Sequence, residues 1–317
     1  MNTTQRFAPA PVEHPKSSAG AGDDDRDGGR VYVYYNDDIA LAVNVALATG
    51  RPLLLSGPSG SGKSALARNV AQKLGWRYYE HVVTARTEAR DLLYRYDSVL
   101  RLAEAQALSQ AGKDIPPADA YVVPGALWWA MSRDTAMVRG NAALDPHYHL
   151  TDESGSDAQD AVVLIDEIDK ADPDLPNGLL VPLGSFRFEV EQTGARISGD
   201  MKRPPLVIIT NNRERELPAT FIRRCVSLKL QSPNKEQLLK VARAVIPAIQ
   251  WNETIGALLA DRLLALSKDQ DRTAAERWST GEYLDAVRAC HALGITDPRD
   301  AALQTLMDIV LVKSQQS

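Results

Sequence analysis

The chain has 317 residues, 44% of them hydrophobic, so it can bury the core of one large domain or of two ordinary ones. Its net charge of −5 argues against binding to nucleic acid or an anionic membrane through overall charge. Cys225 and Cys290 form no C-x-x-C pair, which indicates reduced thiols in a cytoplasmic protein. No membrane-spanning segment or secretion signal is expected, because no apolar stretch approaches roughly 20 residues and the first residues lack one.

The first 30 residues differ in composition from the rest of the chain. Residues 1–30 are rich in Pro, Ala, Gly, Ser and Asp and poor in large apolar side chains. Such a segment cannot bury enough surface to fold, so we expect a disordered tail that contributes nothing to a core. Order should begin near Val31, with a helix that starts near Asp37 or Asp38 and ends before Gly50.

The following segments alternate between strand and helix. Apolar runs predict strands at residues 51–57 and 77–83 and within residues 161–171 and 204–212, and residues 64–75 predict a helix that ends at Gly75. This alternation favours an α/β fold with a parallel sheet covered by helices on both faces. After Gln231, four helix-like segments follow with no strand between them, which indicates a small all-helical second domain.

Residues 57–64 match the pattern G-x-x-x-x-G-K-[ST] between a predicted strand and a predicted helix. Glycines let a loop turn its backbone N–H groups toward a phosphate, and the N-terminus of the helix points at the same group. Lys63 would place a charge on the β- and γ-phosphates, and the Ser64 hydroxyl is a candidate Mg²⁺ ligand. We therefore expect nucleotide phosphates to bind at Gly57, Pro58, Ser59, Gly60, Ser61, Gly62, Lys63, Ser64 and Ala65.

Polar residues follow two of the predicted buried strands. Asp166 and Glu167 end one strand, at the edge of a parallel sheet where ligands bind. Asp166 is a candidate Mg²⁺ ligand, and Glu167 can orient or deprotonate the attacking water. Asn212 ends the other strand and would help to position that water. Further on, Arg223 and Arg224 are either partners of a helix dipole or an arginine finger that reaches a neighbouring subunit.

The phosphate loop, "LIDEID", "IITNN", "ERELPATFIRRC" and the helical C-terminal segments together resemble an AAA+ ATPase of the MoxR-like group, over about residues 31–315. The resemblance implies that Asn212 is the sensor 1 asparagine and that Arg224 is the arginine finger, with Arg223 as the alternative. It makes Arg277 the nearest candidate for the lid arginine. It also implies a hexameric ring that remodels a partner protein, and MoxR-like ATPases are often paired with a von Willebrand factor A domain protein.

These observations lead to a domain division and a function. We expect a nucleotide-binding α/β domain at 31–230, with an insertion at about 86–160, and a helical lid at 231–317. The expected function is Mg²⁺-dependent ATP hydrolysis that drives remodelling or assembly of a partner. The alternative is a slow ATP-gated switch or scaffold. The acidic balance and the lack of a basic stripe argue against a DNA-directed motor.

The insertion is expected to carry partner contacts rather than chemistry, because it holds none of the nucleotide motifs. Its Trp128–Trp129 pair is interpreted as a packing or interface patch, with a base-stacking platform as the alternative. Beyond it, residues 186–197 alternate apolar and polar side chains and predict a hairpin.

Overall fold

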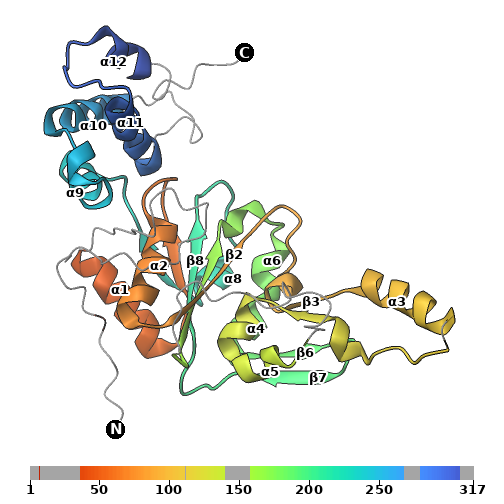
Figure 1. The fold of residues 1–317 in the computed structure, drawn as a ribbon. Coiled ribbons are helices and arrows are strands. Elements are labelled where there is room, and N and C mark those ends of the chain that lie inside the picture. Colours follow the sequence, from red (N-terminus) through yellow and green to blue (C-terminus); the bar gives the residue numbers. More distant parts are fainter. Residues whose placement is uncertain (1–6, 8–35, 111, 140–157, 268–278, 308–317) are drawn as a thin grey trace. The chain divides into compact units, whose positions relative to one another are not determined.

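The computed structural model describes residues 7, 36–110, 112–139, 158–267 and 279–307 (Figure 1). They divide into two compact units. The first contains Phe7, Asp38–Leu55 and Val70–Leu228, and the second contains Ser56–Asn69 and the residues from Lys229 onward. Within the described part of the chain, no helix combines the length and hydropathy that a bilayer crossing requires. The domain boundaries expected from the sequence stay a prediction.

A five-stranded sheet with strand order β2-β5-β8-β1-β9 forms the centre of the first unit. Its strands are β1 (Leu53–Ser56), β2 (Arg77–Val82), β5 (Ala161–Asp166), β8 (Leu206–Asn211) and β9 (Val226–Lys229). β5 pairs in parallel with β2 on one side and with β8 on the other. All residues of β8, and all but the last of β5, are buried, as expected for strands covered on both faces. The predicted α/β class is confirmed.

Helices flank this sheet, and Figure 1 shows α1 on one side of it and α4 on the other. Among the described residues before 229, the α-helices are α1 (Asp37–Thr49), α2 (Lys63–Leu74), α3 (Ser98–Gln110), α4 (Ala126–Met131), α5 (Arg133–Met137), α6 (Asp174–Gly178), α7 (Leu180–Ser185) and α8 (Ala219–Ile222). Gly50 follows α1 and Gly75 follows α2, and both have positive φ angles, of 64° and 67°. Both helices therefore end where the sequence predicts, because glycine adopts this left-handed conformation without steric cost.

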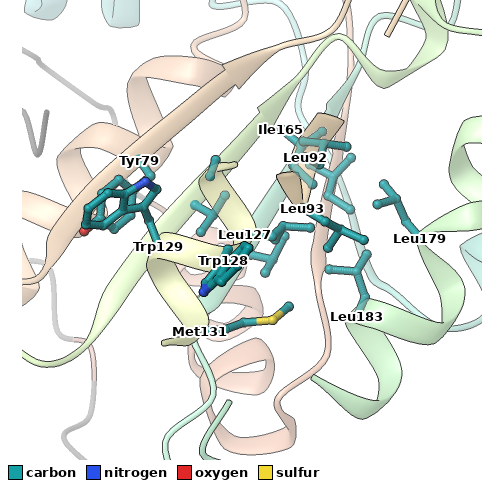
Figure 2. Close-up of a cluster of buried hydrophobic side chains, with 14 of the residues drawn as sticks. Tyr79, Leu92, Leu93, Leu127, Trp128, Trp129, Met131, Ile165, Leu179 and Leu183 are labelled. Carbon is teal, nitrogen blue, oxygen red and sulfur yellow. The ribbon is translucent and has the colours of Figure 1, made fainter. Parts of the chain in front are cut away.

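The tryptophan pair belongs to the hydrophobic core of the first unit. Trp128 and Trp129 on α4 have exposed fractions of 0% and 4% (Figure 2). The ring of Trp129 lies 6.4 Å from that of Tyr79 on β2, and the ring of Trp128 meets Phe188 edge-on at 5.3 Å. The packing interpretation is confirmed. The expectation that these side chains contact a partner is wrong, because α4 carries them into the core beside the sheet.

Elsewhere in the expected insertion, the described residues include a small two-stranded sheet and an exposed helix. β3 (Tyr94–Tyr96) pairs antiparallel with β4 (Val122–Pro124), and α3 connects them. None of the residues of α3 is buried, and Figure 1 shows this helix standing away from the sheet. Val99 and Leu102 on α3 are 78% and 61% exposed. This helix therefore presents apolar side chains that the core of the unit does not use.

The predicted hairpin is confirmed. β6 (Arg187–Val190) pairs antiparallel with β7 (Ala195–Ser198), from Arg187–Ser198 to Val190–Ala195. Val190 and Ile197 are buried, whereas Glu189 and Arg196 are exposed and form a 3.2 Å ion pair across the strands. The alternation seen in the sequence therefore reflects one buried and one solvated face.

One residue of the expected tail, Phe7, is described, and it is docked. Its side chain is 3% exposed. Its backbone N–H donates to Asn44 Oδ1 at 2.8 Å, and its carbonyl accepts from Asn44 Nδ2 at 2.8 Å. Phe7 therefore contributes to the core beside α1, contrary to the expectation that the tail adds nothing. The other residues of the 1–30 tail lie outside the described residues.

The second unit contains the four helices expected after Gln231. They are α9 (Lys235–Val245), α10 (Glu253–Ser267), α11 (Thr280–Ala292) and α12 (Ala301–Leu306). Capping boxes at Asn234 and Ser279 satisfy free backbone N–H groups at the starts of α9 and α11. The helices share one apolar cluster, which includes Leu238, Leu259 and Tyr283.

Candidate functional site

The phosphate loop of the second unit is wrapped around its own lysine. Lys63 is 6% exposed, and its Nζ donates to the carbonyl oxygens of Gly57 at 3.0 Å and Pro58 at 2.8 Å. A Cβ on Gly57 would lie 2.5 Å from the carbonyl oxygen of Leu230, so only glycine permits this close backbone approach. The Ser61 hydroxyl is buried and has no hydrogen-bond partner among the described residues. This unsatisfied donor and the glycine-lined loop fit a bound phosphate.

The first turn of α11 contacts this loop within the same unit. Thr280 Oγ1 donates to the carbonyl oxygen of Gly60 at 2.7 Å. Gly60 has a φ of 73°, and a Cβ there would lie 2.4 Å from Ser279 Cα. The sequence interpretation missed Thr280 and placed the lid arginine at Arg277, which lies outside the described residues. The helical segment therefore contacts the loop through an uncharged residue, Thr280.

The acidic pair lies at the carboxyl end of β5 in the first unit. Asn212 Nδ2 donates to Glu167 Oε1 at 2.9 Å, so the structure brings together two residues that the sequence predicted for the same step. Glu167 has a left-handed backbone, with φ 58° and ψ 47°. Residues other than glycine adopt this conformation at a cost, and such strain clusters at functional sites.

Thr210, the residue before Asn211 in β8, connects the two acidic residues, and the sequence interpretation missed it. It is completely buried, and its hydroxyl donates to Asp166 Oδ1. The hydroxyl oxygen of Thr210 also accepts a hydrogen bond from the backbone N–H of Glu167 at 2.8 Å. A hydroxyl has one proton and two lone pairs, so it can satisfy both groups at once. Thr210 thereby fixes Asp166 and the strained turn at Glu167 relative to each other.

Asp169 is a third residue that the sequence interpretation did not assign, although it belongs to the quoted "LIDEID" motif. It is 2% exposed, and its carboxylate accepts the backbone N–H groups of Asn212 at 3.2 Å and Glu214 at 2.8 Å. Two backbone donors stabilise a buried carboxylate. Asp169 therefore ties the segment after β8 to the segment after β5. The second aspartate of the "LIDEID" motif was the signal by which the sequence could have pointed to Asp169.

Lys170 contacts the other oxygen of the proposed base. Its Nζ lies 2.5 Å from Glu167 Oε2. The hydrogen bond to Glu167 raises the pKa of Lys170 above its usual value, so the ammonium stays charged at neutral pH. Both carboxylate oxygens of Glu167 therefore accept hydrogen bonds, one from the charged Lys170 and one from Asn212.

The two candidate finger arginines follow α8 in the first unit, and both are exposed. Arg224 Nη1 donates to the carbonyl oxygen of Leu180 at 3.2 Å. A cavity of about 930 Å³ adjoins them, and its lining includes Arg51 and Lys202 as further cations. No aspartate or glutamate belongs to the lining of this cavity in the described part of the chain. The local charge is therefore suited to an anionic group.

The proposed Mg²⁺ ligands are chemically suitable. Ser64 offers a hydroxyl and Asp166 a carboxylate, and Mg²⁺ prefers oxygen ligands of this kind. The two residues belong to different units of the structure, as do the phosphate loop and Glu167. Their joint action on one nucleotide therefore stays a prediction.

Comparisons with known proteins agree with the fold. The family model described as AAA domain (dynein-related subfamily) matches residues 52–225. Similar solved structures include a Cytophaga hutchinsonii protein (15% identity, TM-score 0.43, 84% of this chain and 60% of that one). The Thermotoga maritima RuvB Holliday junction branch migration motor is also similar (12% identity, TM-score 0.45, 86% and 67%). So is Brucella abortus NtrX, solved in complex with ADP (14% identity, TM-score 0.51, 92% and 59%).

The limits of these similarities also matter. The chain spans 59–67% of the length of these three chains, and the likeness to NtrX concerns the fold alone. No curated protein matches the sequence at a significant level. Assignment to the MoxR-like group stays a prediction, whereas the family match covers more than half of the chain and includes the phosphate loop and the acidic pair. The chain therefore belongs to the AAA domain family, in its dynein-related subfamily.

Proposed function

We propose that this chain hydrolyses ATP with Mg²⁺, with Glu167 activating the attacking water and Asn212 positioning it. The observation that carries the proposal is the 2.9 Å hydrogen bond from Asn212 Nδ2 to Glu167 Oε1, just beyond two adjacent buried strands. It supports a base and an amide that act on the same water molecule. Membership of the AAA family supports ATP-driven activity in general.

The phosphate loop is the proposed binding site for the nucleotide. Lys63 donates to two loop carbonyls, and phosphate oxygens are stronger acceptors for its ammonium group. The unpartnered Ser61 hydroxyl is a further donor for a phosphate oxygen. Mg²⁺ held by Ser64 and Asp166 would neutralise the negative charge that develops on the phosphates. Together these groups would leave Glu167 to accept the proton of the attacking water.

The assembly and its target are further parts of the proposal. We propose a hexameric ring in which Arg224, or Arg223 in its place, stabilises the transition state in the adjoining subunit. The exposure of both arginines and the acid-free cavity beside them support this role. The work of the ring would be remodelling of a partner protein, with a von Willebrand factor A domain protein as the candidate partner.

One observation favours a slower, switch-like protein instead. Lys170 and Asn212 engage both carboxylate oxygens of Glu167. Glu167 must give up one of these two partners before that oxygen can accept a proton from water, so basal turnover should be slow until Glu167 is released. A partner that stimulates hydrolysis many-fold would support the remodelling function. Slow turnover that no partner changes would support the switch.

Exchange of Glu167 for glutamine tests the proposal, because the amide keeps the shape of the side chain and removes the base. We expect Glu167→Gln to bind ATP and to hydrolyse it about 10²- to 10⁴-fold more slowly. Lys63→Ala should lose nucleotide binding, because the ammonium group is removed. A pull-down with Glu167→Gln in ATP would then identify the trapped partner.

The matched control is Glu236→Gln, because Glu236 also forms an ion pair with a lysine, Lys240, at 2.7 Å on an exposed helix face. This variant should hydrolyse ATP at the wild-type rate. Wild-type hydrolysis by Glu167→Gln would remove Glu167 from the chemistry.

A further inference from the structure

Arg51 forms hydrogen bonds with the segment that carries the two candidate finger arginines. Its guanidinium donates to three consecutive carbonyl oxygens, those of Arg223 at 2.8 Å, Arg224 at 3.2 Å and Cys225 at 2.7 Å. The backbone N–H of Val226 donates in turn to the carbonyl oxygen of Pro52 at 2.8 Å. Residues 51 and 52 therefore hold the whole turn between α8 and β9.

The three hydrogen bonds of Arg51 have a clear physical basis. α8 spans only Ala219–Ile222, and the carbonyl groups at the end of a helix lack partners within the helix. A cation at a helix C-terminus is stabilised by these carbonyls. The planar guanidinium presents several donors in a fixed geometry, so it can bind three carbonyls at once, whereas a lysine ammonium is a single compact group. Arg51 therefore sets the backbone conformation from which Arg223 and Arg224 project.

We propose that Arg51 is a positioning residue for the arginine finger. The proposal rests on the proposed function, in which Arg223 or Arg224 acts on the nucleotide of an adjoining subunit. Arg51 would not touch that nucleotide itself, because its guanidinium is already bound to the finger segment. A finger contributes roughly 10³- to 10⁵-fold in rate, and a misplacement of about 1 Å can cost about 10²-fold. Loss of the three Arg51 hydrogen bonds should therefore slow hydrolysis without weakening ATP binding.

Two substitutions of Arg51 test whether its hydrogen bonds position the finger segment. Arg51→Lys keeps the charge and Arg51→Gln removes it, but neither side chain can bind all three carbonyls. We expect kcat to fall about 10- to 100-fold in both variants, with the KM for ATP and the melting temperature close to wild type. The control is Arg203→Gln, because Arg203 is also an arginine and forms an exposed ion pair with Asp160 through two hydrogen bonds. Its kcat should stay at the wild-type value.

A mixing experiment separates positioning from a general structural role. A Lys63→Ala subunit has a defective nucleotide site but keeps Arg51 and both finger arginines. Mixed rings of Lys63→Ala and Arg51→Gln should therefore recover part of the activity that each variant lacks alone. An Arg51 substitution that damaged its own nucleotide site could not be rescued in this way.

The thiol of Cys225 reports on the turn directly. It is buried, and burial raises its pKa to about 11, whereas the charge of Arg51 opposes this shift only in part. Loosening the turn should expose the thiol, so its alkylation at pH 8 should be several-fold faster in both Arg51 variants. Cys290 is buried in the apolar cluster of the other unit and serves as an internal control, whose alkylation rate should not change. The two sites are distinguished by mass spectrometry of their peptides.

The outcomes distinguish the inference from the function beneath it. Arg223→Ala or Arg224→Ala should also be rescued by Lys63→Ala if the finger acts between subunits. Rescue of neither would overturn the proposed finger and the inference with it. Rescue of one of them without rescue of Arg51→Gln would overturn the inference alone. Unchanged kcat in both Arg51 variants, or equal acceleration at Cys225 and Cys290, would also overturn it.

Discussion

Thr210 offers the sharpest test of how the acidic pair is held. The residue is completely buried, and its hydroxyl bonds both the Asp166 carboxylate and the backbone N–H of Glu167. Valine has nearly the same shape and lacks the hydroxyl, so Thr210→Val removes both hydrogen bonds without opening a large cavity. A hydrogen bond to a charged group contributes about 1.5–3 kcal/mol, and a buried unsatisfied donor costs about 1–3 kcal/mol. We expect the free energy of unfolding to fall by about 2–4 kcal/mol.

Urea unfolding, followed by tryptophan fluorescence and circular dichroism, measures this change. Thr210→Ser is the matched control, because it keeps the hydroxyl and loses only a methyl group, at a cost of about 1 kcal/mol. The left-handed turn at Glu167 depends on the same hydroxyl, so Thr210→Val should also reduce ATP hydrolysis at least about 10-fold, and Thr210→Ser should not. Wild-type stability and wild-type hydrolysis in Thr210→Val would refute the assignment of the hydroxyl as the support of the acidic pair.

Three further predictions follow from burial. Trp128→Ala should lower the free energy of unfolding by about 3–5 kcal/mol in a urea titration, because the side chain is 0% exposed. A decrease below about 1 kcal/mol would contradict the place of Trp128 in the core. The double change Val99→Asp and Leu102→Asp should alter stability by less than about 0.5 kcal/mol in the same assay, because both side chains are exposed; a larger loss would mean that α3 is packed. Burial raises the pKa of the Cys225 thiol from 9.0 to about 11, so the unfolded chain loses this proton first and stability falls as pH rises from 9 to 11. In Cys225→Ala, the melting temperature should therefore fall less steeply between pH 9 and 11 than in the wild type. An equally steep fall in both proteins would contradict the raised pKa of Cys225.

Much of the candidate nucleotide site could be predicted from the sequence, because it depends on residues that are close together in the chain. The pattern from Gly57 to Ser64 specifies a loop, a charge and a helix start within eight positions. Asp166 and Glu167 follow an uninterrupted apolar strand, which places them at one edge of a parallel sheet. The helix ends at Gly50 and Gly75 were predictable for the same reason, since glycine alone adopts their backbone conformation without cost.

The exposure of α4 and α3 was not readable from local sequence. The "ALWWAM" stretch of α4 is apolar on every side, so its composition does not say whether it faces the core or a partner. The structure buries Trp128 and Trp129 because β2 and the β6–β7 hairpin supply the opposing aromatic rings. Val99 and Leu102 are also apolar and remain exposed on α3, a helix in which no residue is buried.

The sequence by itself determined which groups are candidates to bind phosphates, hold Mg²⁺ and activate water, because residue type and local spacing define those chemical properties. Only the tertiary structure decided which side chains hold these groups in place. Thr210 lies 44 residues from Asp166, and Arg51 lies 173 residues from Arg224. A threonine in a strand or an arginine before one has many ordinary uses, and nothing in the local pattern names its partner. The partner is chosen when the sheet sets β8 beside β5 and β9 beside β1, because that strand order brings distant side chains within hydrogen-bond distance.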